Sequence, residues 1–334
     1  MPAEGSPIAV IGAGSWGTAL ALQFAWSGRQ VRLWGRDKDQ LHQMEVERSN
    51  ARYLQDADFP ENLAIEADLQ TCLDGVNDIL IVVPSHGLRE TLTSIAPLLG
   101  DDARVCWATK GFDLPTGRLP HEVATEILGT SRPMAVLSGP TFATEVGQGL
   151  PTAITIAANK PDFAGELATT LSGDKFRAYT SGDMLGVEVG GAVKNVLAIG
   201  AGISDGLGYG ANTRIALINR GLVEMTRLGV ALGASPDTFM GLAGMGDLVL
   251  TCTDDQSRNR RMGLALAAGK SVEDAQQEIQ QVVEGVLAAK AVHKVAKANS
   301  VVMPICDEIY RILYEGVSPR EAVGALMGRA LKPE

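Results

Sequence analysis

The sequence is poor in cysteine and lacks the spacing patterns that cysteine forms in metal sites and disulfide frameworks. Its 334 residues include four cysteines, which are scattered, with no C-x-x-C pair and no metal-like spacing to histidine: Cys72, Cys106, Cys252 and Cys306. Cysteines scattered in this way are usually reduced and mostly buried. We therefore expect a cytoplasmic protein without a metal site.

Positive charge is also scarce. The formal net charge is −10, which argues against general binding to nucleic acid or to an anionic membrane. The first residues lack a basic stretch followed by a long apolar run, so we expect no signal peptide. An anionic ligand would need local basic groups or the N-terminus of a helix, because the overall field repels it.

The length is sufficient for two domains, and the shares of hydrophobic (46%) and charged (20%) residues are ordinary for a globular protein. Strand-like apolar runs alternate with helical segments up to residue 180, and no strand pattern follows. We predict an α/β Rossmann-like domain over residues 1–182, with a mainly parallel, doubly wound sheet. An all-helical substrate and catalytic domain follows over residues 183–334. The predicted strands are 7–12, 30–34, 78–83, 104–108, 134–138, 152–158 and 176–180.

A glycine motif follows the first predicted strand directly. Gly12, Gly14 and Gly17 form G-x-G-x-x-G between this strand and an Ala/Leu-rich helix that extends to Trp26. In such a βαβ unit the first glycine permits a tight turn, the second lets backbone approach a pyrophosphate, and the third allows close helix packing. The pattern predicts a dinucleotide on the helix N-terminus.

The end of the second predicted strand indicates which dinucleotide is bound. An NAD-specific site places an acid there for the ribose 2′-hydroxyl, but this chain has Gly35 followed by Arg36. An arginine suits the 2′-phosphate of NADP. We predict a preference for NADP, and Asp37, one residue later, keeps NAD possible.

Ligands of parallel sheets bind beyond the carboxyl ends of the strands. Three such ends carry polar or glycine-rich segments at residues 84–86, 109–111 and 138–141. Lys110 lies in one of them, so it is either a lysine directed into the ligand crevice or a solvated loop residue.

One lysine, Lys194, interrupts a long apolar segment at residues 184–204, which has helical spacing. Glu188 lies six residues before it, where helical partners are three or four apart. Three interpretations compete. The segment could span a membrane, the lysine could extend its amine to solvent from a structural helix, or it could be a partly desolvated proton-transfer group near an interdomain cleft. Small residues and charges within the segment disfavour the membrane.

Residues 242–261 hold a second group of candidates. Ser257 is a good N-cap for a helix that continues to Ala268. With Arg258, Arg260 and Arg261, this helix start could bind an anion, although a capped surface helix with solvated arginines is the simpler alternative. Asp247 is a carboxylate in a small-residue loop, and such residues more often cap helices than catalyse reactions.

Taken together, these segments resemble bacterial NAD(P)-dependent glycerol-3-phosphate dehydrogenases from Ile8 to about Arg329. The Lys-Asn pair at residues 194–195 and the segment QSRNRR are more specific than the glycine motif. Met245 and Asp255 are small departures from the family pattern. The motifs that carry the resemblance are IGAGSWGTALA, IVVPSHGLRE, TKGFD, LSGPTFATEV, VEVGGAVKNVLAIGAGISDGLGYGANTR, LAGMGDLVLTCTDDQSRNRR and VVEGV.

The resemblance implies reversible hydride transfer between NAD(P)H and C2 of dihydroxyacetone phosphate, giving sn-glycerol 3-phosphate for phospholipid synthesis. It implies Lys194 as proton donor and acceptor, and a homodimer as the assembly. The implied substrate contacts are Lys110, Gly139, Thr141, Lys194, Asp247, Ser257, Arg258 and Asn259. The implied cofactor contacts are Ser15, Trp16, Arg36, Lys110, Ala143, Arg258, Val282 and Glu284, together with the turn of Gly12, Gly14 and Gly17.

Two alternatives remain at this point. Another reductase with a Rossmann and a helical domain, acting on a 3-hydroxyacid or on 6-phosphogluconate, would share the glycine motif and a catalytic lysine. The segment at residues 256–261 argues instead for a phosphorylated substrate with its own helix-terminus site. A nucleotide-binding redox sensor without turnover would need neither Lys110 nor Lys194.

Overall fold

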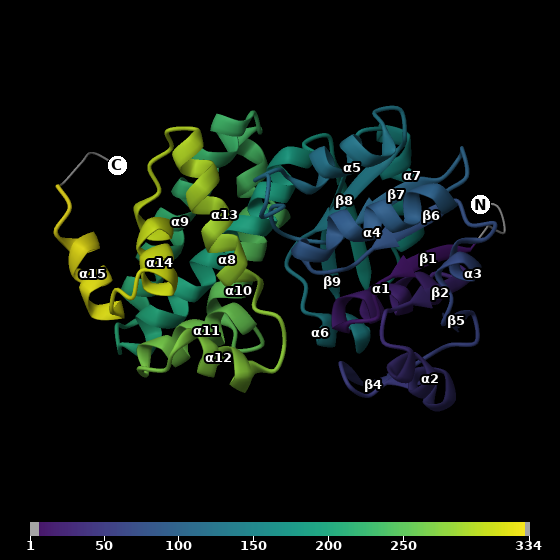
Figure 1. The fold of residues 1–334 in the computed structure, drawn as a ribbon, viewed down its shortest axis with the longest axis horizontal. Coiled ribbons are helices and arrows are strands. Elements are labelled where there is room, and N and C mark those ends of the chain that lie inside the picture. The colour runs from purple at the N-terminus through teal and green to yellow at the C-terminus, as the bar shows by residue number, and fades with distance from the viewer. Residues whose placement is uncertain (1–6, 331–334) are drawn as a thin grey trace. The chain divides into compact units, whose positions relative to one another are not determined.

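The computed structural model describes residues 7–330, which form two compact units (Figure 1). The first comprises residues 7–110 and 120–184, and the second comprises residues 111–119 and 185–330. The predicted domain limits differ from this division at residues 111–119, and by two residues at the boundary, residues 183–184. That segment joins the second unit because its apolar side chains Phe112 and Leu119 are buried in the helical core.

An eight-stranded sheet forms the centre of the first unit. Its order is β10-β9-β8-β7-β6-β1-β2-β5, and all neighbours are parallel except β8 and β9. The six strands from β5 to β8 have the order 3-2-1-4-5-6 of the dinucleotide-binding fold. The predicted α/β fold is confirmed. The strands are β1 (Ile8–Ile11), β2 (Val31–Trp34), β5 (Leu63–Glu66), β6 (Asp78–Ile81), β7 (Arg104–Trp107), β8 (Met134–Ser138), β9 (Thr152–Ala158) and β10 (Phe176–Ser181).

Helices cover both faces of this sheet (Figure 1). All four residues of β1 are fully buried, which explains why its sequence is continuously apolar rather than alternating. The first-unit helices are α1 (Ser15–Trp26), α2 (Lys38–Glu47), α3 (Leu69–Leu73), α4 (Leu88–Ile95), α5 (Pro120–Leu128), α6 (Ala143–Gly147) and α7 (Pro161–Leu171). Helix α1 lies against α6 and α7, and α4 lies beside α5.

Three features of this unit were not predicted. Strand β5 is a four-residue edge strand in which only Leu63 is fully buried, so its pattern is weak. A two-stranded hairpin of β3 (Ser49–Asn50) and β4 (Leu54–Asp58) follows α2. The reversal of β9 relative to β8 also leaves no local trace in the sequence.

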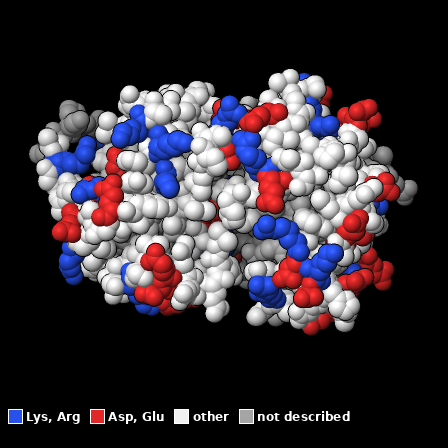
Figure 2. Space-filling model, viewed as in Figure 1, with Lys and Arg blue, Asp and Glu red and all other residues white. Residues whose placement is uncertain are grey.

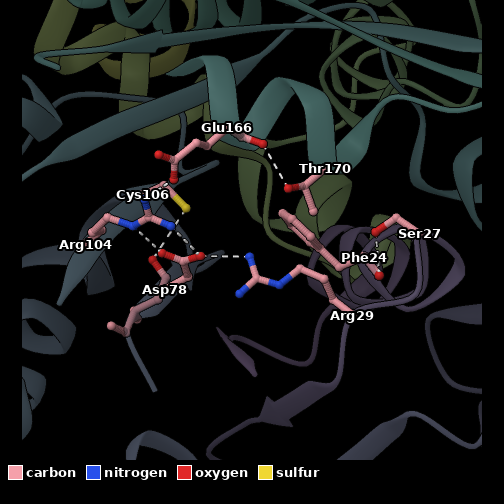
Figure 3. A network of polar contacts seen from close by, with 9 residues as sticks. Phe24, Ser27, Arg29, Asp78, Arg104, Cys106, Glu166 and Thr170 are labelled. Carbon is pink, nitrogen blue, oxygen red and sulfur yellow. Dashed lines mark hydrogen bonds and ion pairs between the residues drawn. The ribbon is translucent and has the colours of Figure 1, made fainter. Parts of the chain in front are cut away.

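A buried ionic network lies at the N-terminal end of β6 (Figure 3). The carboxylate of Asp78 accepts hydrogen bonds from Arg29 at 2.7 Å and from Arg104 at 2.6 and 2.9 Å. Arg104 also pairs with Glu166 of α7 and lies over the ring of Phe163. Burial opposes ionisation of Asp78, but the hydrogen bonds from Arg104 and Arg29 more than offset it, so its pKa is lowered. The network joins four segments that are distant in sequence.

The second unit is helical, as predicted. Its α-helices are α8 (Met184–Gly206), α9 (Ala211–Leu232), α10 (Asp247–Thr253), α11 (Arg258–Ala267), α12 (Val272–Ile279), α13 (Glu284–Ala298), α14 (Pro304–Tyr314) and α15 (Pro319–Met327). Short turns η3 (Pro236–Met240) and η4 (Leu242–Gly246) precede α10, and η4 is a π-helix.

Helix α8 is the core of this unit. Every residue from Gly186 to Ser204 is buried, and glycines let neighbouring backbone approach closely. A Cβ added at Gly202 would lie 2.0 Å from the carbonyl oxygen of Arg260, and one at Gly263 equally close to that of Ile199. Glycine at both positions therefore permits the contact between α8 and α11.

By length and composition alone, α8 could cross a membrane, with a mean hydropathy of 1.3 over its most apolar window. Within the described chain, however, 94% of that window is buried inside the protein. A core helix meets the same criteria, and its burial accounts for the apolar sequence. Charged side chains of both signs are interspersed over the face seen in Figure 2.

Candidate functional site

The glycine motif adopts the turn that the sequence predicts. Gly12 has φ +127°, and a Cβ there would lie 2.2 Å from the carbonyl oxygen of Val82. A Cβ at Gly17 would lie 1.8 Å from the carbonyl oxygen of Gly12. At Gly14, by contrast, the Cβ direction is open, and apart from its chain neighbours no atom of residues 7–330 lies within 4 Å. The turn is thus closed toward the protein and open where a ligand could approach the backbone.

The first turn of α1 fits an anion. Its N-cap, Gly14, has no side chain to occupy the first N–H groups of the helix, and no acidic residue lies in the first turn. Ser15 and Trp16 begin the helix. The indole Nε1 of Trp16 is buried and has no hydrogen-bond partner among residues 7–330. An unsatisfied buried donor beside an open helix terminus fits a bound dinucleotide.

Two amide side chains that the sequence analysis missed hold this turn. Asn50 Nδ2 donates to the carbonyl oxygen of Ala13 at 3.1 Å and to Thr18 Oγ1 at 2.8 Å. Gln40 Nε2 donates to the same carbonyl at 3.0 Å. Asn50 is only 1% exposed. Nothing local in the sequence indicates these bonds, because Asn50 lies 37 residues from Ala13.

The end of β2 has no room for an acid at Gly35. A Cβ there would lie 2.9 Å from the Cβ of Ala13. Arg36 follows and is exposed. Asp37 is the N-cap of α2, where it accepts a hydrogen bond from the backbone of Gln40 at 3.1 Å. The packing of Gly35 against Ala13 therefore disfavours a carboxylate at position 35.

Lys110 and the segment after β8 lie together at the carboxyl-terminal end of the strands, since β7 and β8 are parallel neighbours. Lys110 Nζ donates to the carbonyl oxygen of Gly139 at 3.4 Å, and Thr141 Oγ1 donates to the same oxygen at 3.3 Å. Ala143 begins α6 shortly afterwards. The predicted first-unit contacts Lys110, Gly139 and Thr141 thus form one local group.

In the second unit, Lys194 is paired with a carboxylate that the sequence analysis had placed on the substrate. Its Nζ lies 2.5 Å from Asp247 Oδ1 and 2.9 Å from Thr251 Oγ1. Lys194 is 8% exposed and Asp247 1% exposed. Thr251 donates in turn to the carbonyl oxygen of Asp247 at 2.6 Å. The Asp247 carboxylate therefore holds the lysine amine, and the substrate contact that the resemblance implies for Asp247 stays a prediction.

The π-helix η4 ends directly before Asp247, and π-helical turns are frequent at functional sites. It lies against α8 one helical turn before Lys194, where a Cβ at Gly190 would be 2.5 Å from the carbonyl oxygen of Ala243. Gly190 thereby allows α8 and η4 to approach each other. Thr251 was missed because its role depends on this packing rather than on a motif.

The predicted anion site is partly altered. Ser257 is the N-cap of α11 and accepts from the backbone of Arg260 at 3.2 Å, as expected. The side chain of Arg260, however, is bound to Asp205 at 2.7 Å and to Asp255. The Arg260 guanidinium is therefore paired with two carboxylates of the protein and does not supply a free cation for an anionic ligand. Arg261 is exposed.

Of the three arginines at the start of α11, Arg258 is the candidate that remains for binding an anion. Desolvation by burial lowers its pKa, an effect that the charge of Glu284 opposes and that of Arg261 reinforces. Within the second unit as described, its guanidinium forms no hydrogen bond or ion pair. A desolvated cation of this kind at a helix N-terminus is suited to a phosphate.

Asn259 joins three elements of the second unit. Its Oδ1 accepts from the backbone of Gly285 at 2.8 Å, and its Nδ2 donates to Asn195 Oδ1 at 2.8 Å. Asn195 follows Lys194 on α8, and Gly285 follows Glu284 at the start of α13. Val282, just before α13, is 41% exposed. The predicted second-unit residues Asn259 and Glu284 thus lie on connected elements.

These features define a class of protein: a dinucleotide-dependent oxidoreductase with a Rossmann-type unit and a helical unit that carries a buried lysine. Two family descriptions match the chain. Residues 7–164 match the NAD-dependent glycerol-3-phosphate dehydrogenase N-terminus, and residues 183–324 match the C-terminus of the same family. The chain belongs to the NAD-dependent glycerol-3-phosphate dehydrogenase family.

Individual relatives agree. A Klebsiella pneumoniae protein named glycerol-3-phosphate dehydrogenase [NAD(P)+] is 55% identical over 335 residues, covering 100% of this chain and 99% of the relative. A protein of the same name from Pseudoalteromonas translucida is 54% identical and covers 98% of each chain. The crystal structure of glycerol-3-phosphate dehydrogenase from Coxiella burnetii superposes with a TM-score of 0.95 at 50% identity, covering 98% of this chain and 100% of that one.

Proposed function

We propose that the protein is an NAD(P)-dependent sn-glycerol-3-phosphate dehydrogenase. It interconverts dihydroxyacetone phosphate and sn-glycerol 3-phosphate, a precursor for phospholipid synthesis. The observation that carries the proposal is the buried Lys194–Asp247–Thr251 group in the same unit as the Ser257-capped helix with Arg258. A proton-transfer group and a phosphate site are the two parts that this substrate requires.

In the reducing direction, negative charge develops on the ketone oxygen of the substrate. Lys194, in its ammonium form, stabilises that charge and donates the proton, and in the oxidising direction its neutral amine accepts the proton. Asp247 and Thr251 orient the amine through the contacts at 2.5 and 2.9 Å.

The substrate phosphate needs a separate dianion site. The N–H groups at the start of α11 and the Arg258 guanidinium supply one, and burial of Arg258 strengthens its interaction with an anion. Asn259 holds this helix start to α8 and to the start of α13. We assign the remaining substrate contacts to Asp247 of the second unit and to Lys110, Gly139 and Thr141 of the first unit.

The dinucleotide site comprises the turn from Gly12 to Gly17 and the N-terminus of α1, which would hold the pyrophosphate. When bound, the nicotinamide supplies or accepts the hydride. Arg36 would pair with a 2′-phosphate, and the closed backbone at Gly35 supports a preference for NADP over NAD. We assign further cofactor contacts to Ser15, Trp16, Lys110, Ala143, Arg258, Val282 and Glu284.

A redox sensor without turnover is disfavoured by the oriented lysine. Such a sensor has no need of a buried amine held by a carboxylate and a hydroxyl. A 3-hydroxyacid reductase has no need of the desolvated Arg258 at a capped helix start. Both observations favour a phosphorylated ketone as the substrate.

The test is NADPH oxidation, followed at 340 nm, with dihydroxyacetone phosphate and with unphosphorylated dihydroxyacetone. We expect rapid oxidation with the phosphorylated ketone and a much lower kcat/KM with the other. If neither ketone is reduced, the assignment is wrong. Equal kcat/KM values would contradict the phosphate site.

We further infer a cytoplasmic location, which the four buried, free cysteines support. The partner is a small phosphorylated molecule rather than nucleic acid or membrane. Assembly as a homodimer stays a prediction from the family resemblance.

A further inference from the structure

Asp37 is the carboxylate that keeps NAD possible as the cofactor. It directly follows Arg36 at the end of β2. A carboxylate at this end of the strand accepts a hydrogen bond from a ribose 2′-hydroxyl and repels a 2′-phosphate. If Asp37 carried an uncompensated charge, it would oppose the contribution of Arg36.

Both oxygens of this carboxylate have partners in the structure. Oδ1 accepts the backbone N–H of Gln40 at 3.1 Å, and this bond caps α2. Oδ2 pairs with Nη1 of Arg52 at 3.1 Å. Arg52 lies between β3 and β4, in the hairpin that the sequence analysis missed, and its guanidinium is 5.0 Å from the ring centroid of Tyr53. The hairpin thus brings a cation to the adenosine end of the predicted cofactor site.

We propose that Arg52 is a specificity-determining residue, which favours NADP by neutralising Asp37 beside Arg36. This proposal rests on the proposed function and names a determinant of its cofactor choice. With the pair formed, the site presents the net positive charge of Arg36 to the 2′-phosphate. Without Arg52, the charge of Asp37 cancels that of Arg36, and the carboxylate becomes available to a ribose 2′-hydroxyl.

The exposure of the pair separates this role from a structural one. The Arg52 side chain is 58% exposed and that of Asp37 50% exposed. Exposed ion pairs contribute little to folding stability. A substitution of Arg52 should therefore leave the fold intact, while a phosphate dianion bound nearby would still respond to the change in local charge.

The experiment compares Arg52→Gln with wild type by titration of NADPH and NADH, using quenching of tryptophan fluorescence to obtain Kd. We expect the ratio of the NADH to the NADPH Kd to fall by about tenfold, as for charges that interact near a protein surface. The midpoint of thermal unfolding should not change. Arg177→Gln, at an exposed arginine on β10, is the matched control and should leave the ratio unchanged.

A second pair of variants tests whether Arg52 acts through the charge of Asp37. Asn caps helices about as well as Asp, so Asp37→Asn keeps the α2 cap and removes the charge. In that background, Arg52→Gln should no longer alter the ratio. If it still weakens NADPH binding selectively, Arg52 contacts the phosphate itself and the proposal is wrong. Equal weakening of both cofactors would also overturn it. Because these titrations contain no ketone, failure of the proposed function would appear separately, as absence of turnover by the wild type.

Discussion

The amine of Lys194 lies 2.5 Å from Oδ1 of Asp247, and neither side chain is more than 9% exposed. Breaking a buried pair of this kind is costly, because the remaining side chain loses its opposite charge at a desolvated position. Within α8 the sequence offered Glu188, at the wrong helical spacing. The partner instead comes from 53 residues further along the chain.

The first prediction concerns Lys194→Met. We expect kcat to fall by about 10³-fold or more, because both the proton donor and the charge on the developing alkoxide are lost. We also expect the second unit to lose about 3 kcal/mol of stability, because the buried carboxylate of Asp247 loses its contact with the Lys194 ammonium. The measurements are single-turnover NADPH oxidation and unfolding followed by circular dichroism.

The double variant Lys194→Met with Asp247→Asn serves as its control. Removing the second charge should restore most of the lost stability without restoring activity. A single variant that turns over within tenfold of wild type would exclude Lys194 as the proton donor.

The second prediction concerns Thr251, whose hydroxyl accepts from Lys194 at 2.9 Å. Thr251→Val keeps the shape of the side chain but removes this acceptor, so kcat should fall by about tenfold through misplacement of the amine. Thr251→Ser keeps the hydroxyl and should retain most of the activity. The Kd for NADPH should be unchanged in both. Equal kcat values for the two variants would argue against the orienting role.

The functional residues differ in how far the sequence could reveal them. The glycine turn and the Ser257 cap were predictable, because each depends on a local backbone conformation that few residue types satisfy. Lys194 was conspicuous as a lone cation in an apolar helix. Its partners Asp247 and Thr251 were not, since the pairing depends on how η4 and α10 pack against α8.

The third prediction concerns the network around Asp78. Asp78→Asn should destabilise the first unit by about 3 kcal/mol, because it leaves Arg29 and Arg104 with an uncharged partner at a buried position. The Kd for NADPH should not change, since Asp78 is at the opposite end of the strands from the glycine turn. Tryptophan fluorescence reports this unfolding well, because Trp16, Trp26, Trp34 and Trp107 all lie in the first unit.

The pH dependence gives a further check. The folded-state pKa of Asp78 is lowered, so its contribution is fully present above the unfolded value, about pH 4, and is lost as the pH falls below it. Asp78→Asn should not show this loss of stability at low pH, because it has no carboxylate to protonate. Asp101→Asn, at an exposed carboxylate of the same unit, should unfold like the wild type. An Asp78 variant with an unchanged denaturation midpoint would show that the network adds no stability.

The fold was predictable where the sequence of a single element indicates the structure of that element. Fully apolar β1 indicated a strand covered on both faces, and the loss of strand patterns after residue 180 indicated the change to helices. The hairpin of β3 and β4 and the direction of β9 were not predictable, because these features depend on contacts with distant segments. The assignment of residues 111–119 to the helical unit was missed for the same reason.

The fourth prediction concerns Arg258→Ala. Loss of this desolvated guanidinium should raise KM for dihydroxyacetone phosphate by an amount equivalent to about 2–4 kcal/mol. Unphosphorylated dihydroxyacetone should be affected much less. Arg261→Ala, at an exposed arginine of the same helix, is the matched control. An unchanged kcat/KM for the phosphorylated ketone would place the anion site elsewhere.

The fifth prediction concerns Glu224, a buried carboxylate on α9 that caps another helix. Its Oε1 accepts the N–H of Ile305 at 2.8 Å and its Oε2 that of Cys306 at 3.1 Å, in the first turn of α14. Desolvation raises the pKa of Glu224 to about 7, although these hydrogen bonds oppose it, and the charge of Asp307 adds to the increase.

Between about pH 4.5 and pH 7 the folded protein therefore keeps a proton that the unfolded chain releases. The contribution of Glu224 to stability is greatest below this range, declines as the pH rises through it, and is constant above it. The total decline is on the order of 3 kcal/mol.

Glu224→Gln has no such titration, so its stability relative to wild type should increase from pH 4.5 to pH 7 and then level off. Circular dichroism of urea unfolding measures this difference. Glu273→Gln, at an exposed glutamate of the second unit, should run parallel to wild type throughout. If the Glu224 variant also runs parallel to wild type, the carboxylate is already ionised across this range, and its two backbone hydrogen bonds outweigh the cost of burial.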